Sequence, residues 1–517
     1  MKQFFKYFFG ILDSTQKKRF FLYLVLLFLG SISSILGVGA VIPFVSILVN
    51  PNQFDNIYSL SGFSHFQIIL ISILLLISAF WIKNIIGILL FWFQTKFLNS
   101  IVLSIQKKLF KKYLLMDYEF HLSRSTPTLI RNIGSETNQL STGIINPISI
   151  LITDLFSCIF IVALLLYINF LFSFFTLLIL GVSLFIFMLK VKGILTKYGK
   201  QRATAAKSMT KATLNGFSGI KEIKLYNKEK VFTKEFDERA TMLNKASQFN
   251  QVFQIIPRFF IEAIAITLVL ITLLVLISFG ESTNSIFILL SVFGVAATQL
   301  LPALNRIMQA ITSIRYSIPA LITVYEELSK VDNYSDNFSE KRGALESIRF
   351  NKNISLENIS YSYPDGTQAL KNISVTIEKG KKTAFIGPSG SGKSTLVDLL
   401  MGFYTPQSGR FFIDNKQIKS GKKIQQLFAY IPQQIILYDT SIKENIAFGE
   451  TKASIDETKV WKCLEMAQLD DFVSNLNKGI DTFVGENGIR LSGGQRQRLG
   501  IARASVSYTH LRAHETT

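Results

Sequence analysis

Long apolar runs dominate the chain as far as residue 308, and polar segments separate them. A helix needs about 20 apolar residues to cross a bilayer. The pattern therefore predicts six membrane spans, over residues 20–49, 66–97, 142–168, 170–193, 255–280 and 284–308. The third and fourth spans belong to one apolar run, too long for a single crossing, which we expect to turn at Tyr167–Asn169. These spans predict an all-α membrane domain over residues 1–325.

The segments between the predicted spans differ in charge. Residues 94–140 and 196–249 carry many Lys and Arg residues, whereas the other three connections carry none. Basic connections stay on the cytosolic side, so we expect both of them, and both chain termini, in the cytosol. Their apolar residues recur every three or four positions, which predicts helical extensions with breaks near Ser123–Thr128 and Asn215–Gly219. The basic, Phe-rich stretch Met1–Arg19 is typical of an amphipathic helix on the inner leaflet.

Ionisable residues within or at the end of these spans are costly and need a reason. Among them are Lys83, Asp154, Arg258, Glu262 and Arg306. One interpretation is that Lys83, Arg258, Glu262 and Arg306 line a water-filled substrate cavity that handles a charged headgroup. The other is that Arg258 and Glu262, four positions apart on one helix face, pair with each other while Lys83 extends towards the interface. Both interpretations stay open here.

The formal net charge of +20 also has two interpretations. A basic protein can bind nucleic acid through its phosphates. Here, however, Lys and Arg flank the apolar runs, as expected of cytosolic loops in a membrane protein. We therefore expect membrane lipid, and no nucleic acid, as a partner. The two cysteines, Cys158 and Cys463, lack the spacing of zinc ligands or of a disulfide framework.

The composition changes after residue 325. Residues 326–345 are polar and indicate a linker, and residues 346–504 have the pattern of an α/β domain. Alternating apolar and polar residues predict a strand over Ile354–Tyr363. A second short strand is expected over Lys382–Ile386; it would run directly into a Gly-rich loop, followed by a helix over Leu396–Met401. This order of elements is that of a P-loop (RecA-like) nucleotide-binding domain.

The Gly-rich loop has the complete spacing of a P-loop. Its glycines let backbone N–H groups surround phosphate oxygens, and the following helix directs its positive N-terminus at them. The lysine reaches the β- and γ-phosphates of ATP, and the Ser394 hydroxyl binds Mg²⁺. The predicted ATP-binding residues of this loop are Gly387, Ser389, Gly390, Ser391, Gly392, Lys393, Ser394 and Thr395.

A P-loop alone leaves several classes of nucleotide-binding protein open. The segment Leu491–Gln495, about 100 residues further on, resembles the signature of ABC transporters. The resemblance implies that Tyr363 stacks on adenine, that Gln433 positions Mg²⁺ and the attacking water, and that Glu486 is a coupling residue. It also implies two cassettes facing each other, so that ATP lies between the P-loop of one and the signature of the other. The signature residues that would act in trans are Ser492, Gly493, Gly494 and Gln495.

This arrangement makes a homodimer of half-transporters the simplest assembly, and the resemblance implies an ABC-type ATPase. The two cytosolic loops, and a cassette that follows the membrane domain, resemble exporters rather than importers. The two cytosolic breaks would be coupling helices that rest on the cassette near Gln433. The match stops at Ala504. Family members continue with an apolar strand that ends in Asp-Glu, whereas Ser505–Thr517 has no such strand and resembles a non-native tail. The catalytic glutamate is therefore absent from this polypeptide, which we expect to be C-terminally truncated and inactive in hydrolysis. Its full-length parent should be an ATPase.

Several segments resemble bacterial flippases of lipid-linked oligosaccharides. They are Ala384–Leu400, Ile256–Arg258 with Glu262, Asn305–Ile307 and the external segment Asn50–His65. This resemblance implies a multi-pass protein of the bacterial inner membrane that moves a lipid-linked or other amphipathic substrate. An exporter of lipid, peptide or drug is the alternative. An alternative of another class is a membrane-bound remnant that binds nucleotide without hydrolysing it.

Overall fold

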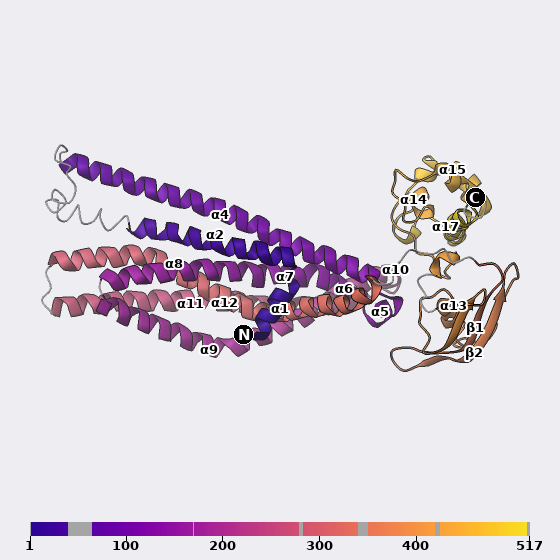
Figure 1. Ribbon diagram of the computed structural model, residues 1–517, viewed down its shortest axis with the longest axis horizontal. Coiled ribbons are helices and arrows are strands. Elements are labelled where there is room, and N and C mark those ends of the chain that lie inside the picture. The colour runs from indigo at the N-terminus through magenta and orange to yellow at the C-terminus, as the bar shows by residue number, and fades with distance from the viewer. Residues whose placement is uncertain are drawn as a thin grey trace. The chain divides into compact units, whose positions relative to one another are not determined.

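The computed structural model describes residues 2–39, 65–168, 170–278, 283–339, 350–418 and 424–513. The chain divides into two compact units, which are described separately. Unit 1 consists of Met1–Met116 and Arg124–Lys341, and unit 2 of Asp117–Ser123 and Arg342–Thr517. Unit 1 is helical, and unit 2 contains a sheet and several short helices (Figure 1). A helical membrane domain followed by an α/β nucleotide-binding region confirms the predicted fold class.

Unit 1 is built mainly from long helices that run side by side (Figure 1). Its principal helices are α1 (Lys2–Ile11), α2 (Ser14–Gly39), α4 (His65–Leu115), α8 (Asn146–Ile168), α9 (Phe170–Ser218), α11 (Glu229–Ser278) and α12 (Thr283–Ser339). Five helical segments in the described ranges are long and apolar enough to cross a membrane. They correspond to the second to sixth predicted spans. The first predicted span coincides with α2 up to Gly39, and its remainder, 40–49, lies outside the described residues.

The long helices continue past their apolar parts, as the basic connections predicted. Residues 126–145 join α4 to α8 through α6 (Thr126–Arg131), α7 (Thr137–Leu140) and two π-helical turns, η2 (Asn132–Glu136) and η3 (Ser141–Ile145). Two short helices, α5 (Tyr118–Ser123) and α10 (Ile220–Leu225), lie at the predicted breaks. The expected turn at Tyr167–Asn169 matches the end of α8 at Ile168 and the start of α9 at Phe170.

The N-terminal helix α1 is amphipathic, as its sequence predicted. Phe8 is buried and packs against Phe20, whereas Phe5 and Phe9 are exposed. Tyr7 lies against Tyr325 on α12, with ring centroids 4.8 Å apart. The range 326–345, expected as a linker, is helical as far as Ser339 because α12 continues through its polar residues.

Unit 2 contains a four-stranded antiparallel sheet of order β2-β1-β3-β4. The strands are β1 (Asn353–Ser362), β2 (Gln368–Glu378), β3 (Ser408–Ile413) and β4 (Lys416–Gln417). β1 confirms the strand expected from alternation, since Ile354, Leu356, Ile359 and Tyr361 are all buried. They form a core with the helix α13 (Lys393–Leu400), which begins at the P-loop lysine.

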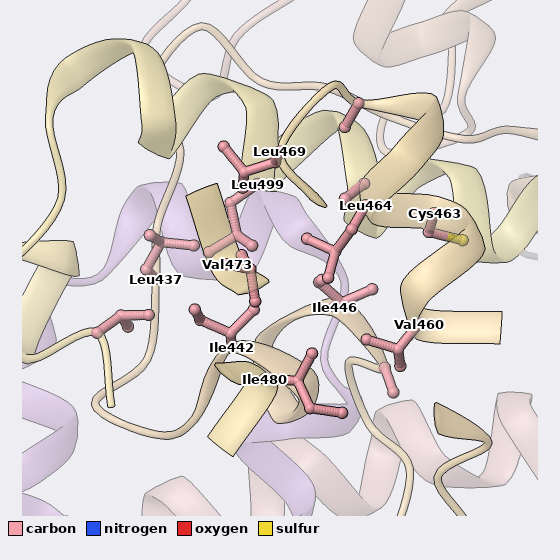
Figure 2. Close-up of a cluster of buried hydrophobic side chains, with 14 of the residues drawn as sticks. Leu437, Ile442, Ile446, Val460, Cys463, Leu464, Leu469, Val473, Ile480 and Leu499 are labelled. Carbon is pink, nitrogen blue, oxygen red and sulfur yellow. The ribbon is translucent and has the colours of Figure 1, made fainter. Parts of the chain in front are cut away.

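A second core of unit 2 is mainly helical. It joins α14 (Ile442–Ile446), α15 (Glu457–Met466), α16 (Asp470–Ser474) and α17 (Gly493–Ala513) with side chains from the segments between them. Figure 2 shows apolar side chains of this core, of which Leu464, Val473 and Leu499 are completely buried. Cys463 belongs to this core as a buried free thiol. The core holds α17, and with it the signature segment, in place.

One predicted strand is wrong. Residues 382–386 form neither helix nor strand, and the side chain of Ile386 is 94% exposed. A strand exists only when a neighbour accepts and donates its backbone hydrogen bonds. No described residue of unit 2 pairs with this segment.

Candidate functional site

The P-loop wraps round the N-terminus of α13. Gly390 and Gly392 have φ values of +82° and +86°, which L side chains rarely adopt. A Cβ atom at Gly392 would also lie 2.6 Å from the backbone oxygen of Ala369. Both glycines are therefore required by the backbone path of the loop, and this path produces the concave array of N–H groups that binds phosphate.

Lys393 folds back over this loop. Its Nζ donates to the carbonyl oxygens of Gly387 at 2.8 Å and Pro388 at 2.7 Å, and lies 3.5 Å from Ser391 Oγ. The ammonium group thus stands over the concave side of the loop, where an ATP phosphate would compete for it. Ser389 and Ser394 are exposed at the loop. The residues present fit a Mg²⁺-bound nucleotide, with Lys393 on the phosphates and Ser394 at the metal ion.

Tyr363 lies at the end of β1, next to the P-loop. Its hydroxyl is 2.7 Å from Oγ1 of Thr395, which is buried in the first turn of α13. Its ring packs edge-on against Tyr361 and Tyr404, with centroids 5.4 Å and 5.9 Å away. The structure therefore brings the predicted adenine-stacking residue to the predicted phosphate-binding loop, although the two are 32 positions apart in sequence.

The signature segment forms the N-terminus of α17. Ser492 Oγ accepts a hydrogen bond from Gln495 N at 3.2 Å, and Gln495 Oε1 accepts one from Ser492 N at 2.8 Å. This reciprocal arrangement is a capping box, which fixes the first turn of a helix. Gly493 and Gly494 are exposed, and a Cβ atom at either would meet nothing within 4 Å. The backbone N–H groups between the two capping residues are thus accessible from outside.

Gln433 and Glu486 stand apart from the P-loop contacts. Gln433 is exposed within 428–440, a segment without helix or strand, and Glu486 is exposed in the 3₁₀ turn η8 (Glu486–Gly488). Within the described part of the chain, neither side chain forms a hydrogen bond or ion pair with the P-loop. Their predicted roles, in positioning water and in coupling, therefore stay predictions.

Side-chain contacts that the sequence did not specify join α5 to the sheet within unit 2; the sequence predicted only that the first break rests on the cassette, near Gln433. The Tyr361 hydroxyl donates to Glu119 Oε1 at 3.1 Å. Tyr118 packs on Phe403 and Tyr404, with ring centroids 5.2 Å and 5.9 Å away. Burial and the Glu119 carboxylate raise the pKa of Tyr361, so the hydroxyl remains a donor. The break near Ser123–Thr128 indicated where the chain turns, but its partners lie hundreds of positions further on.

Unit 1 contains a cavity of about 580 Å³ between α11 and α12. Arg258, Glu262 and Arg306, three of the four predicted cavity residues, line it together with Asn305 and Gln309. Lys83 does not line it; its Nζ lies 5.6 Å from the centroid of the Phe80 ring on α4. The cavity wall thus combines two guanidinium groups with the Glu262 carboxylate and with neutral polar and apolar side chains.

Both arginines of the cavity have carboxylate partners. Arg258 Nε donates to Glu262 Oε1 at 2.8 Å, which confirms the pairing expected from their spacing. Arg306 donates through Nε and an Nη atom to the two oxygens of Asp154, both at 2.8 Å. The side chains of Arg258 and Arg306 remain 60% and 51% exposed. Arg258 therefore lines a cavity and also pairs with Glu262, whereas the binding of a substrate in this cavity stays a prediction.

Both halves of the chain match models of one family. The model of the ABC transporter transmembrane region matches residues 2–301, and the ABC transporter model matches residues 370–512. The chain belongs to the ABC transporter family. It is an exporter half-transporter, a multi-pass membrane protein with a membrane domain followed by an ATPase domain, which generally implies use of ATP and Mg²⁺.

Curated relatives and a solved structure resemble the chain at modest identity. The ATP-dependent lipid A-core flippase of Ralstonia nicotianae is 28% identical over 418 residues, covering 78% of this chain and 68% of the relative. The heterocyst differentiation ATP-binding protein HepA of Nostoc is 31% identical over 339 residues, covering 62% and 53%. A bacterial Atm1-family ABC exporter with ATP bound has a TM-score of 0.74 at 20% identity, covering 96% of this chain and 85% of the other.

Proposed function

We propose that this protein is a homodimeric, ATP-driven flippase of the bacterial inner membrane whose substrate is an anionic amphiphile, specifically a lipid-linked oligosaccharide. The observation that carries this proposal is the pair of arginines, Arg258 and Arg306, on the wall of the cavity in unit 1. A charge within a membrane domain is costly and generally serves function. Guanidinium groups bind phosphate oxygens through several N–H donors at once, and a pyrophosphate-linked lipid supplies such oxygens.

The ion pairs leave donors free for this ligand. Arg306 uses Nε and one Nη atom for Asp154, and Arg258 uses Nε for Glu262. An Arg side chain has five N–H donors, so each guanidinium keeps N–H groups for a phosphate. Asp154 would hold Arg306 in position, since its carboxylate is 7% exposed and binds both donors of one guanidinium edge.

The homodimer is supported by two exposed surfaces. The accessible N–H groups of Gly493 and Gly494 fit the γ-phosphate of an ATP bound to a partner's P-loop. On α10 and beside it, apolar side chains are exposed: Phe217 at 74%, Leu225 at 71% and Tyr226 at 66%. A partner's cassette would cover them.

We propose further that this chain binds ATP at Lys393, Ser394 and Tyr363. The Lys393 ammonium stands over the phosphate-binding loop, and the Tyr363 hydroxyl lies 2.7 Å from Thr395 Oγ1 at the first turn of the helix that follows this loop.

Binding to the protein in nanodiscs tests the substrate. Native mass spectrometry should show saturable binding of a polyprenyl-diphosphate glycan, weakened by Arg258→Gln. Lys83→Gln, which removes a charge from a span outside the cavity, is the matched control and should bind normally. Preferential binding of lipid A would favour a lipid exporter, and preferential binding of an uncharged drug would contradict the proposal. Loss of folded protein in Arg258→Gln would show a structural role for the pair instead.

A further inference from the structure

A second, apolar cavity adjoins the one that contains the arginines. It measures about 100 Å³ and lies between α8, α9, α11 and α12. The cavity that contains Arg258 and Arg306, called the arginine cavity below, and the apolar cavity have Ala297 and Leu301 of α12 in common. The two cavities are therefore neighbours that share part of their wall on α12.

The register of α11 places these cavities in sequence along one helix face. Arg258 and Glu262 line the arginine cavity, and Ala265 and Val269 line the apolar cavity. Residues at these intervals share one face of a helix. At 1.5 Å per residue, Ala265 lies about 4.5 Å and Val269 about 10 Å beyond Glu262 along the axis. A ligand lying along this face would have its polar end at the arginines and its apolar end one to two turns away.

The lining of the apolar cavity suits hydrocarbon and excludes water. Small side chains, Ala265, Ala296 and Ala297, leave the space, and Leu and Val residues form most of the remaining wall. The hydroxyl of Ser173, one of its few polar groups, donates to the backbone oxygen of Leu165 at 2.8 Å. A water in such a site would lack the two to four polar partners it needs.

We propose that this apolar cavity binds the head-proximal segment of the substrate's hydrocarbon chain while the anionic head occupies the arginine cavity. This proposal rests on the proposed function and assigns a place to the other end of the same molecule. A water occupies about 30 Å³, so the cavity holds only about three such volumes, a segment of a few carbon atoms. The rest of the chain would leave past Val269, whose side chain is 42% exposed.

Photo-crosslinking of the full chain in nanodiscs tests the assignment. One probe is a polyprenyl diphosphate with a diazirine on its head-proximal isoprene unit, and the other carries the diazirine at the far end of the chain. The head-proximal probe should label peptides of α8, α9 and α11 that line the cavity, including Cys158, and the far-end probe should not. Equal labelling of these peptides by both probes would overturn the proposal, and this comparison needs no variant.

Matched variants give a second readout. Ala265→Phe fills the cavity and should lose the head-proximal label, whereas Ile266→Phe, at a 63% exposed neighbour outside it, should keep the label. Unchanged labelling in Ala265→Phe would contradict the proposal. So would equal labelling by a diazirine-bearing phosphatidylglycerol, which would assign the cavity to bilayer lipid. If the probe binds but labels other peptides, only the assignment of the hydrocarbon chain to the apolar cavity is wrong. If the probe does not bind saturably, the proposed function also fails.

Discussion

Arg306 on α12 and Asp154 on α8 form a two-donor ion pair within the membrane domain, with both N–O distances at 2.8 Å. The residues are 152 positions apart, and the pair joins two helices that also pack through Cys158, Ala303 and Ile307. The Asp154 side chain is almost completely buried and that of Arg306 is half exposed. Loss of the ion pair should therefore cost more when it leaves the buried Asp154 carboxylate unpaired than when it leaves the half-exposed Arg306 guanidinium unpaired.

This asymmetry predicts the order of stability among variants of the pair. Arg306→Gln should destabilise the membrane domain by about 3 kcal/mol, because it leaves a buried, unpaired carboxylate. Asp154→Asn should cost less, since the guanidinium reaches the cavity. The Asp154→Asn/Arg306→Gln double variant should be more stable than Arg306→Gln alone. Thermal unfolding in detergent measures this order, with Glu262→Gln as the exposed control; equal losses for both single variants would contradict it.

The capping box of the signature segment predicts a local effect on α17. Ser492→Ala removes the acceptor for Gln495 N and should destabilise the first turn by about 1 kcal/mol. Gln495→Ala removes the reciprocal bond to Ser492 N and should have a smaller effect in the same turn. Hydrogen exchange of residues 493–497 reports the change, and exchange in α15 serves as an internal control. Unaltered exchange in both variants would show that the caps do not hold this helix end.

A second capping box, at α14, predicts a dependence of stability on pH. Glu444 accepts hydrogen bonds from Ser441 N and Oγ and pairs with Lys452, and these contacts lower its pKa to about 2. The folded pKa lies below the ordinary value of 4.5. The stabilisation is therefore complete above about pH 4.5 and is lost as the pH falls towards 2.

The measurement is the difference in unfolding temperature between the wild type and Glu444→Gln. This difference should be constant from pH 7 to pH 5 and should shrink as the pH falls below about 4.5. Protonation of Glu444 in the wild type then removes the carboxylate charge that the variant already lacks. A difference that grows in acid would contradict the assigned contacts. Glu457→Gln, on the exposed pair with Lys443, is the control for general charge effects.

The sequence predicted those features that depend on residue types a few positions apart along the chain. Six apolar runs, the P-loop and the signature follow from residue type and order, because a bilayer has a fixed thickness and because the loop needs glycine where φ is positive. The Arg258–Glu262 pair follows from four-residue spacing on one helix. Each of these features involves neighbours in sequence, and backbone geometry alone determines how such neighbours meet.

The remaining features depend on contacts between distant segments. Nothing near Asp154 indicates Arg306, and nothing near Tyr361 indicates Glu119, since only the packed fold brings them together. Lys83, like Arg258, is a basic residue within a predicted span, but it does not line the cavity. The strand expected at 382–386 failed for a related reason: its residues have strand propensity, but a strand also requires a neighbour.

Nucleotide binding by the purified chain tests the central claim most directly. A fluorescent ATP analogue with Mg²⁺ should bind saturably to the wild type, and Lys393→Ala should lose this binding, because Lys393 is the cation over the phosphate-binding loop. Lys381→Ala, at an exposed lysine before the loop, is the matched control and should bind normally. Equal binding by the wild type and Lys393→Ala would contradict the assignment of the ATP site.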